Sequence, residues 1–243
     1  MVSPVIPPAF TISLVIPALN EEESIGSVLD AIHRQPLQGI LQEILVVDNG
    51  SSDSTSSLAR QHGACVLSET QRGYGWACAA GARQAQGEIL VFMDADGADD
   101  PRQILDLVEP FLQPNGADMV LGSRLRGQRD KKSMPFQQLF GNWLAALCFR
   151  RLYGLTITDL APFRAVRRTR LLELDMQEMT YGWPTEMIAK AARAQWKIIE
   201  IPVNYHPRRS GRSKISGTLR GTLLAAWFIL TTILRYHAPA SSR

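Results

Sequence analysis

Cysteine is scarce in this chain of 243 residues, which contains only Cys65, Cys78 and Cys148. Their spacing matches neither a disulfide framework nor a metal-binding motif. The first residues, MVSPVIPPAF, also lack the basic region and long apolar stretch of a secretory leader. These absences predict a protein of the reducing cytoplasm.

Other patterns that would define a function class are missing as well. No G-x-G-x-x-G follows the first apolar run, which argues against a dinucleotide-dependent oxidoreductase. The sequence has no fixed-period repeat and no low-complexity tract. With 45% hydrophobic and 20% charged residues, it predicts one ordinary globular domain, or one domain with an appendage.

Lysine is absent from the first half of the chain. Residues 1–121 contain 5 Arg and no Lys against 16 Asp and Glu, whereas residues 122–243 contain 21 Lys and Arg against 7 acidic residues. Such asymmetry predicts a polyanionic partner: nucleic acid, an anionic membrane face or a phosphorylated substrate. The alternative is that the two halves neutralise each other across an interface. Nucleic acid is disfavoured because no recognition module is present and the basic residues lie among turns.

Apolar runs alternate with helical patterns along most of the chain. The runs are so uniformly apolar that both faces of each strand should be buried, which is typical of a parallel α/β sheet with helical crossovers. The segment 156–165 is interpreted as a turn, and 122–135 as a mobile basic loop that closes on anions. Strands are predicted at 11–17, 43–48, 64–67, 88–94, 117–122 and 197–206, and helices at 22–33, 54–61, 75–85, 101–113, 137–152 and 184–195.

Polar segments follow three of these strands: PALNEEES (17–24), DNGSSDST (48–55) and DADGADD (94–100). The carboxyl ends of parallel strands meet at one edge of the sheet, where ligands of such folds bind. Folding alone does not require all three loops to be acidic or rich in Gly, Asn and Ser. The sequence therefore predicts a binding site at this edge.

The last of these loops places Asp94 and Asp96 on the same side of an extended chain. Two clustered carboxylates favour a cation, and oxygen ligands suit Mg²⁺ or Mn²⁺ shared with phosphates. A diphosphate ligand is the first expectation. Asp99 and Asp100 are interpreted instead as a solvated turn, with Asp100 capping a helix whose first residue is Pro101.

The C-terminal segment is uncharged from Gly221 to Leu234. Fourteen helical residues span about 21 Å, which is short of a bilayer core of roughly 30 Å. We expect a helix that lies on a membrane, packs against another protomer or docks on the core of its own domain.

Six motifs, in the order PALNEEES, VVDNGSSDST, DADGADD, GSRLRG, DLAPFRA and RRSGRSK, resemble family-2 glycosyltransferases of the GT-A fold. Within that family the dolichyl- and polyprenyl-phosphate mannosyl- and glucosyltransferases are most similar. The resemblance implies a Rossmann-like α/β fold with a mostly parallel sheet flanked by helices, a catalytic domain over 1–214 and a C-terminal apolar helix and tail over 215–243.

The resemblance also implies an activity: inverting transfer of a hexose from a UDP- or GDP-sugar to a polyprenyl-phosphate lipid. It implies a Mg²⁺ or Mn²⁺ cofactor and peripheral contact with the cytoplasmic face of a membrane through 215–236, and homo-oligomerisation stays open. The alternative is the same transfer to a soluble phosphorylated or hydroxyl acceptor.

Site residues are carried over from the matching motifs. For the nucleotide sugar, Asp48 pairs with the base, Ser51 lies beside it and Arg72 borders the sugar nucleotide, while the pocket is shaped by Pro17, Asn20 and Glu21. The metal ligands are Asp94 and Asp96, of which Asp96 is also assigned to catalysis. Ala98 departs from the pattern, because alanine cannot supply the polar side chain that members often place there.

In the second half, the resemblance assigns the acceptor phosphate to Arg124, Arg208, Ser213 and Lys214. Asp159 and Glu186 match positions that face the acceptor and are candidate catalytic bases. The alternative is that these two carboxylates only balance Arg164 or Lys190.

Overall fold

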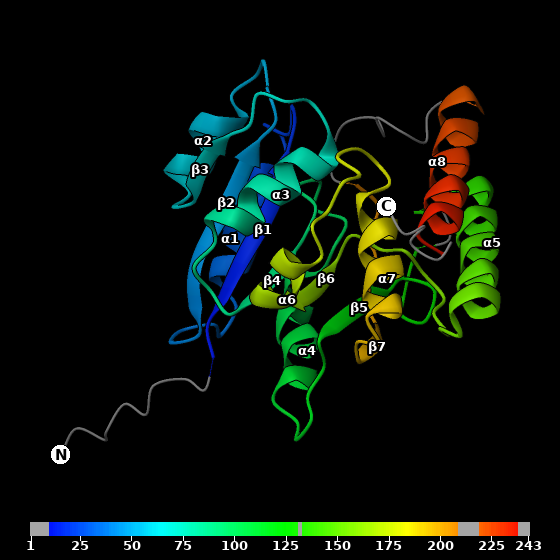
Figure 1. Ribbon diagram of the computed structural model, residues 1–243. Coiled ribbons are helices and arrows are strands. Elements are labelled where there is room, and N and C mark those ends of the chain that lie inside the picture. Colours follow the sequence, from blue (N-terminus) through cyan, green and yellow to red (C-terminus); the bar gives the residue numbers. More distant parts are fainter. Residues whose placement is uncertain (1–9, 131–132, 209–218, 238–243) are drawn as a thin grey trace.

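The structure is a computed structural model that describes residues 10–130, 133–208 and 219–237, in which one seven-stranded sheet has helices on both faces (Figure 1). The strands are β1 Ile12–Ala18, β2 Leu41–Asp48, β3 Cys65–Ser68, β4 Ile89–Phe92, β5 Met119–Ser123, β6 Arg164–Arg167 and β7 Ile198–Pro202. The α-helices are α1 Ile25–His33, α2 Thr55–Gln61, α3 Tyr74–Gln84, α4 Ile104–Val108, α5 Phe136–Tyr153, α6 Arg168–Glu173, α7 Trp183–Arg193 and α8 Leu219–His237. Short 3₁₀ turns, η1 Pro101–Gln103 and η2 Glu109–Phe111, flank α4.

The strand order is β3-β2-β1-β4-β6-β5-β7, and every neighbouring pair is parallel except those made by β6. The predicted mostly parallel α/β sheet is therefore confirmed. The register pairs Ala18 at the end of β1 with Asp48 at the end of β2. This register brings the loops after β1 and β2 together at one edge of the sheet.

Two apolar cores lie on the two faces of the sheet. One packs α1 and α4 against the strands through residues such as Ile25, Leu29 and Leu107. The other is built from α3, α5 and α7 and includes Phe149 and Trp183. Because both faces are covered, β4 and β5 are buried at every position and do not alternate, as the sequence predicted.

The segment interpreted as a turn, 156–165, contains the start of β6, so that prediction is wrong at its end. β6 reads RAVR and pairs antiparallel with β4 and β5. Its first residue, Arg164, is buried. Its guanidinium donates to the carbonyl oxygens of Leu160, Ala161 and Pro184, and these hydrogen bonds compensate for its loss of water. A short strand that begins and ends with arginine has no apolar run to reveal it.

The basic segment 122–135 begins inside β5 and then forms hydrogen bonds with the chain that follows β7. Its first residues complete β5, and the Tyr205 N–H donates to the Gln128 carbonyl at 2.9 Å. A Cβ on Gly127 would lie 2.0 Å from the Val203 carbonyl oxygen, so this close approach requires glycine. The predicted loop is wrong for Gly122 and Ser123, which pair with β7, whereas Gln128 and Asp130 bond to Tyr205 after β7 and closure on anions stays a prediction. Lys131 and Lys132 lie outside the described residues.

Helix α8 packs one side against α5 and α7, with Ile233 buried between them. The Tyr153 hydroxyl donates to the Ile233 carbonyl at 2.6 Å. Within the ranges described above, no helix has both the length and the apolar character needed to cross a bilayer. Of the three arrangements that the sequence left open for this helix, docking on the core of its own domain is therefore observed for one face of α8.

Candidate active site

The loops after β1 and β2 form one hydrogen-bonded unit. Asn20, which has a positive φ of 50°, accepts the Ser52 N–H through its side chain at 2.8 Å. Its own N–H donates to the Ser51 hydroxyl at 2.9 Å, and the Glu21 N–H donates to the Thr55 hydroxyl at 2.8 Å. Three predicted nucleotide-pocket residues are thus brought together. Pro17 lies in β1 beside Val47 of β2, one residue before both strands end.

Asp48 is nearly buried at the end of β2. Its carboxylate accepts the Ser51 N–H at 2.9 Å and the Ser56 hydroxyl at 2.5 Å. Burial by itself would raise the pKa of Asp48, but these hydrogen bonds outweigh it and lower the pKa below its usual value. The side chain is therefore a fixed anion at the edge where a base would bind.

Asn49, which the sequence analysis did not single out, ties a third loop to this edge. Its side-chain amide donates to the carbonyls of Glu69 and Gln71, and its oxygen accepts the Gly73 N–H at 2.8 Å. The predicted Arg72 is held in this loop and lies over Gly50, where an added Cβ would be 3.8 Å from the Arg72 Nε. In the sequence, an asparagine directly after a predicted strand was the signal that could have indicated this role.

We expect Asp48→Ala to weaken binding of the cognate nucleoside diphosphate by about 1–3 kcal/mol, because a charged hydrogen bond to the base is lost. Isothermal titration calorimetry with UDP and GDP in the presence of Mn²⁺ measures this change. The matched control is Ser56→Ala, which removes a hydrogen bond to the same carboxylate on the side of α2 and should leave the affinity unchanged. Wild-type affinity in Asp48→Ala would assign Asp48 to the turn alone.

Three carboxylates gather in the loop after β4. Burial, followed by the neighbouring charge of Asp96, raises the pKa of Asp94 to about 7, and the Tyr74 hydroxyl contacts its Oδ1 at 3.3 Å. Asp96 is buried and accepts the Ala98 N–H at 2.9 Å. The predicted pair thus lies together, under strong mutual repulsion that a cation would relieve.

Asp99 is the third carboxylate, and its interpretation as part of a solvated turn is wrong. It is 2% exposed, because its side chain folds back so that Oδ2 accepts the Asp94 N–H at 3.1 Å. Burial and the charges of Asp94 and Asp96 raise its pKa well above the usual value. Its other oxygen, Oδ1, is buried without a hydrogen-bond partner among the described residues. Asp100 caps η1 as predicted, accepting the Arg102 N–H at 3.1 Å, but it is buried too, so the solvated interpretation is also wrong for Asp100.

These residues fit a divalent cation that also binds a diphosphate. Within the described part of the chain, no three acidic, histidine or cysteine side chains converge to hold a metal by themselves. Two carboxylates and an unpartnered buried oxygen are what Mg²⁺ or Mn²⁺ needs when phosphates and water complete the shell. When bound, such a cation would neutralise the charge that develops on the departing nucleoside diphosphate.

Two arginines face this acidic loop. The Arg208 Nε lies 3.0 Å from Asp96 Oδ2, so the guanidinium pairs with a predicted metal ligand. Arg124 stacks over the ring of Tyr205, 5.0 Å from its centroid. Both arginines favour the ionised form of Asp94. Of the four predicted phosphate-binding residues, these two lie at the site; Ser213 and Lys214 lie outside the described residues.

Arg124 is held by Asp159 in a buried bidentate pair. Its Nε and Nη2 donate to the two Asp159 oxygens at 2.8 and 2.7 Å, and its backbone N–H donates at 2.9 Å. Asn142 of α5 adds a hydrogen bond to Asp159 at 2.8 Å. Burial would lower the pKa of Arg124, but the Asp159 charge outweighs it and raises the pKa above its usual value. With both oxygens occupied, Asp159 positions Arg124.

Glu186 is fully buried, and its carboxylate is likewise occupied by hydrogen bonds and an ion pair. It accepts the N–H groups of Gln177 and Glu178, at 2.8 and 2.6 Å, and pairs with Lys190 at 2.7 Å. The Lys190 pairing is the alternative that the sequence left open, whereas Asp159 pairs with Arg124 and not with Arg164. This geometry favours positioning roles for both carboxylates, and their catalytic assignment stays a prediction.

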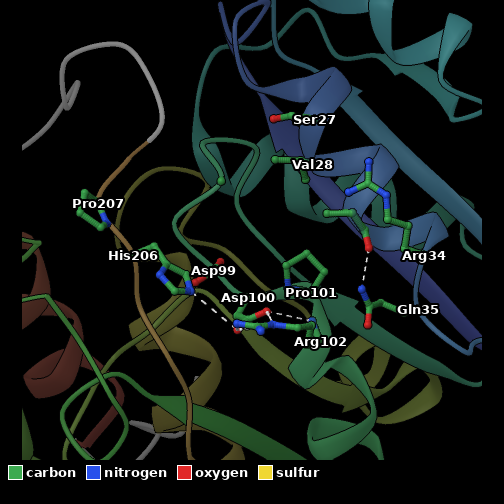
Figure 2. A pocket seen from close by; sticks show the side chains of 12 residues that line it. Ser27, Val28, Arg34, Gln35, Asp99, Asp100, Pro101, Arg102, His206 and Pro207 are labelled. Atoms are coloured by element: carbon green, nitrogen blue, oxygen red, sulfur yellow. Dashed lines mark hydrogen bonds and ion pairs between the residues drawn. The ribbon is translucent and has the colours of Figure 1, made fainter.

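A cavity of about 530 Å³ borders the acidic loop on the side of α1 (Figure 2). Its lining includes Ser27 and Arg34 of α1, and Asp99 and His206 from the far wall. In Figure 2, Asp100 contacts both Arg102 and His206 across the floor of this space. Among the residues that the structure describes, no predicted site residue lines the cavity, although Gly97, Asp99 and Asp100 of the acidic loop do.

An α/β sheet with nucleotide-type loops after β1 and β2 and an acidic loop after β4 defines a GT-A-like glycosyltransferase. The chain belongs to glycosyl transferase family 2, whose model matches residues 13–174. The predicted family and its transferase class are therefore confirmed.

Similar proteins form two groups, relatives matched by sequence and solved structures matched by fold. An undecaprenyl-phosphate mannosyltransferase of Micrococcus luteus is 33% identical over 224 residues, which cover 85% of this chain and 88% of that protein. An uncharacterised glycosyltransferase of Mycobacterium tuberculosis is 38% identical over 221 residues, covering 88% of this chain and 94% of that protein.

The second group is represented by the glucosyl-3-phosphoglycerate synthase of Mycobacterium tuberculosis. Its crystal structure with Mn²⁺, UDP and glucosyl-3-phosphoglycerate superposes with a TM-score of 0.74 at 27% identity, covering 96% of this chain and 82% of that one. The same synthase has also been crystallised with Mg²⁺ and UDP. Family membership alone therefore leaves the acceptor open.

Proposed function

We propose that this protein transfers a hexose, with inversion, from a nucleotide sugar to the phosphate of a polyprenyl lipid, using Mn²⁺ or Mg²⁺. The observation that carries the proposal is the facing of Asp94, Asp96 and Asp99 by Arg124 and Arg208. The carboxylates suit a metal-bound diphosphate, and guanidinium groups suit a second phosphate beside it.

The state of the two candidate bases supports a phosphate acceptor. An acceptor hydroxyl must lose its proton during transfer and needs a general base, whereas a phosphate is already ionised at neutral pH. Asp159 is committed to Arg124, and Glu186 to Lys190 and two backbone N–H groups. A nucleophile that requires no base fits these occupied carboxylates.

In this proposal the described residues divide the work. Asp48 and the Asn20–Ser51 unit bind the nucleoside, and the acidic loop binds the diphosphate through the cation. Asp159 and Asn142 hold Arg124 toward the acceptor phosphate. Arg208 pairs with Asp96, and with a cation held by that carboxylate its guanidinium would be available to bind the acceptor phosphate.

The test is transfer of radiolabelled hexose from UDP- and GDP-sugars with Mn²⁺ to undecaprenyl phosphate dispersed in detergent, compared with 3-phosphoglycerate. We expect label to enter organic-extractable lipid. Label found only in the soluble acceptor would establish the second candidate, transfer to a phosphorylated metabolite, which the likeness to glucosyl-3-phosphoglycerate synthase favours.

Replacing Arg208 by alanine is expected to lower transfer to polyprenyl phosphate by about 10–100-fold, the range for losing a hydrogen bond to a charged group. Affinity for the nucleoside diphosphate with Mn²⁺ should stay within about threefold, because the cation already neutralises Asp96 in that complex. Arg126→Ala is the matched control: Arg126 is half exposed and lies in the preceding basic segment. An equal loss of donor affinity in Arg208→Ala would assign this arginine to the donor diphosphate.

A further inference from the structure

Helices α5 and α8 lie side by side at one flank of the molecule (Figure 1). Every exposed Phe and Trp among the described residues is on one of these two helices. The most exposed are Phe136 at 77%, Trp227 at 66% and Trp143 at 57%. Soluble surfaces rarely gather large aromatic side chains in this way, so the cluster marks a contact surface.

On α5 the aromatic residues form a single stripe. Phe136, Phe140 and Trp143 are spaced four and three residues apart, which places them on the same helix face. The rings of Phe140 and Trp143 are 5.7 Å apart. We define the aromatic face as this stripe together with Trp227, Phe228 and Leu234 of α8, which are also exposed.

The opposite side of α5 faces the active site. Asn142, Ala145 and Phe149 are buried there, and Asn142 donates to the Asp159 carboxylate that holds Arg124. A helix with side chains is about 10 Å across. The aromatic face therefore lies about one helix diameter from the residues assigned to the acceptor phosphate.

Charge selects the partner for this face. Neither α5 nor α8 contains an aspartate or glutamate, and Arg150 and Arg151 are exposed at the end of α5. Two copies meeting through this face would bring together helices without acidic residues, so these arginines would find no opposite charge. An anionic lipid surface offers apolar depth for the aromatic rings and phosphates for the arginines.

We infer that the aromatic face of α5 and α8 docks on the interface of an anionic bilayer. The rings enter the region between headgroups and acyl chains, and α5 carries the Arg124 site to the membrane surface. This inference rests on the proposed function only for the nature of the acceptor. It assigns to α5 a membrane contact that the sequence placed solely in residues 215–236.

The test measures binding of the full chain to vesicles without any acceptor lipid or donor. Phe140→Gln/Trp143→Gln should lower partitioning into vesicles containing about 30 mol % phosphatidylglycerol by about tenfold or more, because two large apolar side chains no longer enter the interface. Arg150→Gln/Arg151→Gln should reduce the preference for anionic over neutral vesicles.

The matched control is Leu105→Gln/Leu112→Gln, which replaces two exposed apolar residues on and after α4. It should leave partitioning unchanged. Unchanged Mn²⁺-dependent nucleotide binding would show that each variant is folded.

Failure of this inference is distinguishable from failure of the proposed function. Wild-type protein that ignores both kinds of vesicle overturns the docking surface, while transfer to detergent-dispersed polyprenyl phosphate still tests the acceptor. A wild-type dimer in light scattering that becomes monomeric in Phe140→Gln/Trp143→Gln, without vesicle binding, overturns it in favour of a second copy.

Discussion

Asp96→Asn should abolish Mn²⁺-dependent binding of the nucleotide sugar and lower turnover by at least about 100-fold, because the cation that would hold the diphosphate loses a charged ligand. The contacts of Asp96 indicate that this substitution should change the metal site and leave the fold intact. Asp96 is buried in the acidic loop with Asp94, and its Oδ2 lies 3.0 Å from the Arg208 Nε. Asparagine keeps the shape and an acceptor for the Ala98 N–H, so the fold should be retained.

Calorimetry with Mn²⁺ and nucleoside diphosphate, together with steady-state turnover, measures this loss. Asp106→Asn is the matched control, since Asp106 is an exposed carboxylate on α4. Turnover equal to wild type in Asp96→Asn would remove both the metal and the catalytic assignment. Asp99→Asn is informative in the same assay: if its unpartnered Oδ1 completes the shell in place of the residue missing at Ala98, Mn²⁺ affinity falls there too.

The second large effect concerns the buried ion pair. Asp159→Asn is expected to lower the free energy of unfolding by about 3–5 kcal/mol, because Arg124 would stay buried with its charge uncompensated. Urea unfolding measures this value. Glu173→Gln is the control, since Glu173 is 65% exposed and lies 3.8 Å from Arg170. A surface pair of that kind contributes about 0–1 kcal/mol.

Asp159→Asn, together with a double variant, distinguishes a positioning role of Asp159 from a catalytic one. If Asp159 only positions Arg124, Arg124→Met/Asp159→Leu should recover much of the lost stability without recovering transfer. Asp159→Asn that unfolds like wild type yet is inactive would contradict the positioning role and return Asp159 to the candidate bases.

Much of the fold, and the clustering of the candidate site residues at one sheet edge, was predictable from local sequence. Runs buried on both faces predict parallel strands, and the polar segments after β1, β2 and β4 must meet at one edge because parallel strands end there. The position of Asp48, Asp94 and Asp96 at this edge was therefore predictable without coordinates, while their roles stay predictions. The cap by Asp100 was predictable because its partner, the Arg102 N–H, is only two residues away.

What the tertiary structure decided depends on contacts between residues far apart in the chain. Asp159 and Arg124 are 35 residues apart, and neither shows in its own neighbourhood that the other will neutralise it. Arg164 is buried in the sheet, where its guanidinium donates to the carbonyl of Pro184, 20 residues further along the chain. Likewise, only the packing of α5 decides that Asn142 faces the active site while Trp143 faces outward. Periodicity reports a residue's own element, whereas burial and charge pairing are properties of the assembled fold.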